Sequence, residues 1–167
     1  MASKATLCLL FLACGAIGAA WADDADGIVG QWLTEDSDAR FEIYKEGGKY
    51  CGKIVWLQEP LYPQDDAEAG RPKHDRKNPD PAKRDQPMAG LQLLKDSEYK
   101  GDNTWAGGTI YNPENGKLYR ARLRLDGNDK LKVRGFIGIS LIGETTVWTR
   151  YEQPVEAPAE KKAEPGK

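Results

Sequence analysis

The chain has 167 residues, of which 40% are hydrophobic and 30% are charged, and its 26 acidic residues face 24 Lys and Arg. This length fits one domain, and so polar a composition excludes a protein with several membrane-spanning helices. The formal net charge of -2 gives no overall basic character, which disfavours bulk nucleic-acid binding. Eighteen Gly, seven Tyr and five Trp favour turns and pleated aromatic surfaces over long helices.

The first 22 residues have the features of a secretory signal peptide. Lys4 precedes an apolar run over 5–17 that is too short to span a bilayer comfortably, and Ala20-Trp21-Ala22 places small residues before a cleavage site. We therefore predict export to the periplasm or the exterior, with no transmembrane span in the mature protein. A retained N-terminal anchor and lipidation at Cys14 are the alternatives.

The mature domain is expected to span residues 23–152, and 153–167 form a tail rich in Pro, Ala, Glu and Lys that we predict to be disordered. Cys51 is the one cysteine left after cleavage, so no intramolecular disulfide can form. The register of its hairpin turns Cys51 outward between Lys49 and Lys53, and we expect an unreactive, partly covered thiol. Intermolecular pairing and a redox role are the alternatives.

Between these ends, apolar and polar residues alternate in short runs that Gly, Asn and Asp interrupt every eight to twelve residues. The predicted strands are 28–33, 40–45, 49–57, 91–94, 103–111, 117–125, 130–136 and 144–151. Nearly all can pair as antiparallel hairpins, and closure into a barrel removes the exposed edges. The predicted fold is all-β: an eight-stranded antiparallel β-barrel with one long loop after the third strand.

Hairpin registers follow from turn lengths. A two-residue Gly47-Gly48 turn pairs Phe41 with Ile54 on the inner face and Glu42 with Lys53 on the outer face. This hairpin therefore carries complementary charges on its solvent side.

A three-residue turn at 127–129 has a different consequence for the next hairpin, because it sets like charges opposite one another. Arg122 then faces Arg134 and Arg124 faces Lys132, at a cost of roughly 0.2–1 kcal/mol per pair. We expect these four cations to contact an anionic partner, such as a lipid headgroup or a polyanionic envelope surface. The alternative is a set of solvated side chains screened by salt.

An odd-length turn at 112–116 predicts one further inner face, which mixes aromatic and small residues. Its members are Trp105, Gly107, Thr109, Tyr111, Tyr119, Ala121 and Leu123. This mixture fits either a cavity for one small ligand or a packed interior. We prefer a cavity for a hydrophobic or lipid-like ligand, with Trp105, Tyr111, Tyr119 and Val133 as candidate lining residues. A filled barrel would instead act as an envelope interaction module, through its basic outer face and charged loop.

Several blocks resemble one known family. They are Gly30-Gln31-Trp32, the segments 52–57, 105–119 and 131–136, and Trp148-Thr149-Arg150. Together they look like the bacterial exported family catalogued as domain of unknown function 2147, and Gly-x-Trp is similar to the motif of lipocalin-like barrels. The resemblance implies a lipocalin-like barrel in the periplasm or secreted, with no established activity. In such folds an Arg packs over the Trp, so we expect Gly30, Trp32 and Arg150 to close the barrel structurally.

No catalytic group is evident from residue types and spacing. His74 is the single histidine and lies in the charged loop 58–87, whose acids lack the spacing of a calcium loop. We therefore expect no metal, no cofactor and no enzyme activity. The loop is either a lid over the barrel mouth or a solvated excursion packed on the barrel side.

Overall fold

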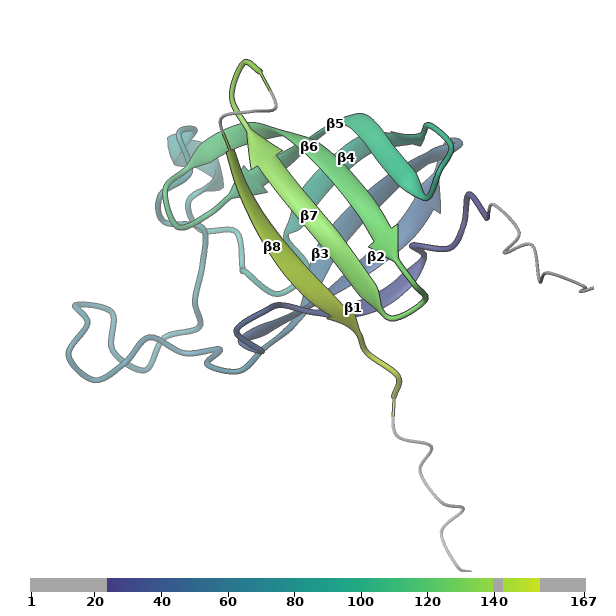
Figure 1. Cartoon of the computed structure of the whole chain (residues 1–167). Coiled ribbons are helices and arrows are strands. Elements are labelled where there is room, and N and C mark those ends of the chain that lie inside the picture. Colours follow the sequence, from purple (N-terminus) through teal and green to yellow (C-terminus); the bar gives the residue numbers. More distant parts are fainter. Residues whose placement is uncertain (1–23, 140–142, 154–167) are drawn as a thin grey trace, which may run out of the picture.

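The computed structural model describes residues 24–139 and 143–153. Its strands form one closed antiparallel barrel in chain order, with β8 pairing back to β1 (Figure 1). The strands are β1 Gly30–Leu33, β2 Ala39–Glu46, β3 Lys49–Leu57, β4 Gln92–Tyr99, β5 Thr104–Asn112, β6 Lys117–Asp126, β7 Lys130–Phe136 and β8 Gly143–Arg150. The predicted eight-stranded barrel is confirmed.

The long connection after β3 contains one 3-10 turn, Pro81–Lys83, and extends beside one end of the barrel (Figure 1). Within the described ranges, no helix is long and apolar enough to cross a membrane. The predicted signal peptide over 1–22 lies outside the described residues, as does the tail from 154 onward.

Two predicted registers are confirmed. On β2 and β3, Phe41 pairs with Ile54 and Glu42 with Lys53, and the last two side chains form an ion pair of 3.0 Å. On β6 and β7, the outer face sets Arg122 opposite Arg134 and Arg124 opposite Lys132. The short Gly-containing turns therefore fix these hairpins as expected.

The predicted inner face of β5 is correct at Trp105, which pairs with Leu123, but it is wrong after Ala106. The β5–β6 register shifts between Ala106 and Thr109. Gly107 has a φ of +86°, which a residue with a side chain rarely adopts, and a Cβ on Gly108 would collide with the Lys95 carbonyl. These two glycines form a bulge that reverses the alternation. Ile110, and not Tyr111, comes opposite Tyr119.

One end of the barrel is closed around Trp32, which is completely buried and donates a hydrogen bond of 2.8 Å from Nε1 to the Ile28 carbonyl. The Arg150 guanidinium lies over the indole, with Cζ 4.2 Å from the ring centroid. Its Nη2 donates to the Gly27 carbonyl at 2.6 Å and its Nε to the Asn128 carbonyl at 2.6 Å. The expected closure by Arg150 over Trp32 is confirmed in geometry.

The segment 24–29 crosses this closed end. Trp105 donates from Nε1 to the Ala25 carbonyl at 3.0 Å, and Asp26 accepts hydrogen bonds from Tyr50 at 2.6 Å and from Lys45 at 2.7 Å. The Lys45 ammonium and the Tyr50 hydroxyl lower the pKa of Asp26. The chain before β1 therefore seals the floor of the barrel.

Trp32→Ala should lower the free energy of unfolding by about 3–5 kcal/mol, because it removes a fully buried aromatic side chain and the ring under Arg150. Trp56→Ala is the matched control, since Trp56 lies on β3 with 36% of its surface exposed. Denaturant titration measures both. Equal losses in the two variants would contradict a special role for the Trp32 closure.

Candidate functional site

A cavity of about 1290 Å³ opens at the other end of the barrel. The connections 34–38, 58–91 and 112–115 reach its mouth, and the interior lies between the strands. The deeper wall is apolar and consists of Phe41, Ile54, Leu93, Ile110, Val133 and Trp148. The part of the cavity that enters the barrel is therefore apolar, which is the setting of most small-molecule sites.

Small residues create this space. Gly135 lines the cavity on β7, and a Cβ placed on it would have Ile110 and Tyr119 as its nearest neighbours at 3.6 Å, an ordinary contact. Ala121 pairs with it on β6. Phe41 on β2 and Trp148 on β8 also line the cavity and stack with ring centroids 4.5 Å apart. The cavity is thus bounded by aromatic rings at Phe41 and Trp148 and has free space at Gly135, which has no side chain.

The structure places the four residues predicted to line the cavity in different positions. Tyr119 and Val133 line its wall, and Tyr111 reaches it at the mouth from beside the long loop. Trp105 is completely buried at the closed end and does not line the cavity. Alternation along a strand distinguishes inside from outside, but it gives no height along the barrel axis.

Asp75 ties the long loop to the barrel. It is buried, with 1% of its surface exposed, and accepts hydrogen bonds from the Tyr111 hydroxyl at 2.8 Å and from Asn78 Nδ2 at 2.6 Å. Burial and the hydrogen bond to Asp75 raise the pKa of Tyr111 to about 12. The Tyr111 proton therefore stays in this contact at physiological pH.

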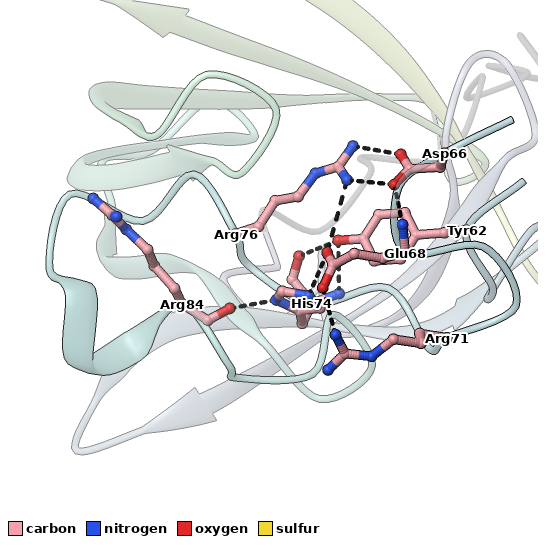
Figure 2. Close-up of polar contacts among 7 residues, drawn as sticks. All are labelled: Tyr62, Asp66, Glu68, Arg71, His74, Arg76 and Arg84. Carbon is pink, nitrogen blue, oxygen red and sulfur yellow. Dashed lines mark hydrogen bonds and ion pairs between the residues drawn. The ribbon is translucent and has the colours of Figure 1, made fainter.

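The loop also has an internal polar cluster around His74 (Figure 2). The His74 Nε2 atom lies 2.9 Å from Glu68 Oε2, and Nδ1 contacts the Arg84 carbonyl. Arg76 forms an ion pair with Asp66 at 2.9 Å. Since both ring nitrogens of His74 face acceptors, the cluster suits the doubly protonated ring.

The same contacts set the pKa of His74. The Arg84 carbonyl raises it, burial opposes this, and Glu68 raises it further. The Tyr62 ring packs edge-on against the imidazole at 5.5 Å, and the Arg76 guanidinium lies 4.4 Å from the Tyr62 centroid. The loop is therefore folded on itself, and its Tyr62, His74 and Arg76 side chains line the mouth of the cavity.

Acidic side chains dominate the mouth. Of the three loop cations that line it, Lys73 pairs with Glu59 at 3.7 Å and Arg76 with Asp66 at 2.9 Å, whereas Lys77 has no acidic partner within 4 Å among the described residues. Five further acids line the mouth without a basic partner within 4 Å among the described residues: Glu35, Asp36, Asp38, Glu114 and Glu144. The rim of the cavity thus carries an excess of negative charge.

The cationic residues predicted on the outer face lie away from this cavity. Lys132 pairs with Asp126 at 2.8 Å, and Arg134 donates to Thr145 Oγ1 at 2.7 Å.

Cys51 pairs with Tyr44 in the β2–β3 register and is 5% exposed. No group of three or more His, Cys, Asp or Glu side chains within 24–139 and 143–153 is arranged to hold a metal ion.

The loop cluster should loosen as the pH rises. Because folding raises the pKa of His74, its protonated contacts stabilise the loop fully below the unfolded value of about 6.5 and lose their effect as the pH passes the folded value. Amide hydrogen exchange over 62–86 between pH 5.5 and 8.5 measures this. After correction for intrinsic exchange rates, protection of this loop should fall with rising pH in the wild type and stay constant in His74→Gln. A wild-type protection that does not change with pH would refute the role of His74 in holding the loop.

The family model described as "Uncharacterized protein conserved in bacteria (DUF2147)" matches residues 30–150, which cover all eight strands. The structure is also similar to the protein HP1028 from Helicobacter pylori, which is described as belonging to the lipocalin family. That match has a TM-score of 0.62 and 23% sequence identity over 75% of this chain and 83% of the other, and it supports the lipocalin-like fold. No curated protein matches the chain. The chain therefore belongs to the DUF2147 family of bacterial proteins, as its sequence blocks indicate.

Proposed function

We propose that the protein is a non-enzymatic binder of a small hydrophobic or amphipathic molecule, which it holds inside the barrel. The observation that carries the proposal is the cavity of about 1290 Å³ with an apolar inner wall. Burial of a ligand against such a wall contributes about 25 cal/mol for each Å² of apolar surface removed from water. A filled-barrel interaction module is disfavoured because the cavity reaches inner-face residues such as Ile54 and Val133.

The wall chemistry supports binding over catalysis. Its deep part is formed by side chains such as Ile54, Val133 and Trp148, which can neither transfer a proton nor act as a nucleophile. Most titratable groups that line the cavity belong to the connections at the mouth or to the long loop, such as Glu35, Asp36 and His74. This distribution suits a site that shelters an apolar body and leaves one end of the ligand near solvent.

The predicted signal peptide adds a location to the proposal. Export would place the binder in the bacterial envelope or outside the cell, where free apolar molecules need a carrier because water solvates them poorly. The proposal requires no cofactor and no nucleic acid.

Gly135→Leu should weaken binding of the neutral fluorescent probe N-phenyl-1-naphthylamine by about tenfold or more, because the added side chain enters the cavity between Ile110 and Tyr119. Thr149→Leu adds similar apolar bulk on the exposed outer face of β8 and should leave the affinity unchanged. Gly135→Ala should give an intermediate loss. Equal affinity of a folded Gly135→Leu variant and the wild type would reject the internal site.

The acidic rim predicts which headgroup the ligand carries. Dodecanol and dodecyltrimethylammonium should displace the probe at lower concentration than dodecanoate, because a carboxylate at the mouth would meet Glu35, Asp36 and Glu144. The three compounds share one chain length, so competition titrations at two salt concentrations isolate the headgroup. Tighter binding of dodecanoate would show that the rim charge does not select the ligand.

A further inference from the structure

The outer face of the β6–β7 hairpin carries six cations. They are Arg120, Arg122, Arg124, Lys130, Lys132 and Arg134, and the strands set Arg122 opposite Arg134 and Arg124 opposite Lys132. Figure 1 shows these two strands side by side on one wall of the barrel. Like charges in directly opposed pairs cost free energy, so the hairpin lacks an internal reason to gather them.

The neighbouring strands place uncharged residues directly beside four of these cations. On β5, Thr104 pairs with Arg124 and Ala106 with Arg122, and on β8, Thr145 and Val147 occupy the corresponding positions beside Arg134 and Lys132. All four are uncharged. Asp126 pairs with Lys132 near the turn, but no acidic side chain of the described residues lies within 4 Å of the Arg122 or Arg124 guanidinium.

An apolar patch continues this face at the mouth end of the hairpin. Leu118 on β6 is 60% exposed, and Ile137 and Ile139, directly after β7, are 62% and 61% exposed. The pairing of Arg120 with Phe136 places Leu118 and the start of the β7–β8 connection at the same height on the barrel. Ile137 also lines the mouth of the cavity. The order from mouth to turn is therefore apolar patch first, then cations.

We propose that this edge of the barrel mouth docks on an anionic lipid bilayer. Leu118, Ile137 and Ile139 enter the boundary between headgroups and acyl chains, while Arg120 and Arg122 contact the phosphates above them. Exposed apolar side chains next to basic ones are the combination that interfacial membrane proteins use. A soluble polyanion would match the cations, but it would leave the three apolar side chains in water.

The orientation places the cavity opening next to the membrane surface. The rim acids are distributed around this opening: Glu35 in the β1–β2 connection accepts a hydrogen bond of 3.1 Å from Val147 N of β8, Glu144 lies on β8, and Glu114 lies in the turn before β6. A hydrophobic ligand could then pass between membrane and cavity without crossing bulk water.

Co-sedimentation with vesicles tests the proposal, using a chain that starts at Asp23 and so retains every described residue of the closed barrel. Binding to phosphatidylglycerol–phosphatidylcholine vesicles should exceed binding to pure phosphatidylcholine and fall as salt is raised from 50 to 300 mM. Each cation near such a surface contributes about 1 kcal/mol, so Arg122→Glu with Arg124→Glu should weaken binding by at least about tenfold. Lys49→Glu with Lys95→Glu makes the same change in net charge on β3 and β4 and should have a small effect.

Ile137→Ser with Ile139→Ser separates a bilayer from a soluble polyanion. The double variant should lose most binding at 300 mM salt, where screening leaves the apolar contribution dominant, and should still bind heparin as the wild type does. Full vesicle binding by this variant would overturn the bilayer proposal in favour of a polyanion. Equal losses in the β6 and β3–β4 charge variants would overturn the docking surface itself. Gly135→Leu should bind vesicles normally, which keeps the surface separate from the cavity.

Discussion

Closure of the barrel depends on a short seam between β1 and β8. Only two residue pairs join these strands, Trp32 with Arg150 and Leu33 with Thr149, whereas β6 and β7 share seven. Arg150 reinforces the seam from the side: it covers the Trp32 ring and donates to carbonyls of the segment before β1 and of the β6–β7 turn. One guanidinium therefore joins three parts of the chain at the point where the sheet has the fewest ladder hydrogen bonds.

This closure lets the other end of the barrel remain hollow. Tightly packed aromatic side chains at the floor, including Trp32, Trp105 and Tyr50, supply burial that the interior near Gly135 and Ala121 does not. A void lined by apolar groups forfeits contacts and costs stability unless a ligand fills it. Stability is thus concentrated at the floor, and the mouth is held by local contacts such as Asp75 with Tyr111.

Much of the fold follows from the sequence because short Gly-rich turns leave little freedom in register. The β2–β3 and β6–β7 pairs were predictable for this reason, and so was the Trp32–Arg150 closure once the family blocks were seen. The inner face of β5 could not be predicted, because the consecutive residues Gly107 and Gly108 fit either a regular strand or a bulge. The contact that favours the bulge, with the Lys95 carbonyl, comes from β4. Likewise β4 extends to Tyr99 although Lys95 and Asp96 interrupt its alternation.

Residues of the candidate site could be predicted only where the inward or outward direction of a side chain is enough to place it in the cavity wall. Alternation places Tyr119 and Val133 on the inner wall, but the same rule puts Trp105 there, and its height at the floor depends on how far strands slide past one another in the closed barrel. The loop contacts had no periodic signal at all. Asp75, Glu68 and Arg76 looked like solvated charges in the sequence, and tertiary contacts alone distinguish the buried Asp75 from its exposed neighbours.

The β6–β7 hairpin can carry its cationic face because its inner face compensates for it. Two opposed like-charge pairs cost roughly 0.4–2 kcal/mol together. On the inner side, Leu123 pairs with Val133 and Leu125 with Leu131, all at most 8% exposed, and burial of each such side chain contributes about 1.5–3 kcal/mol. The hairpin therefore stays paired although its outer charges repel. That repulsion persists while the face is in water, and an anionic surface would relieve it, so contact with such a surface would favour the folded hairpin as well as bring the cavity mouth to the membrane.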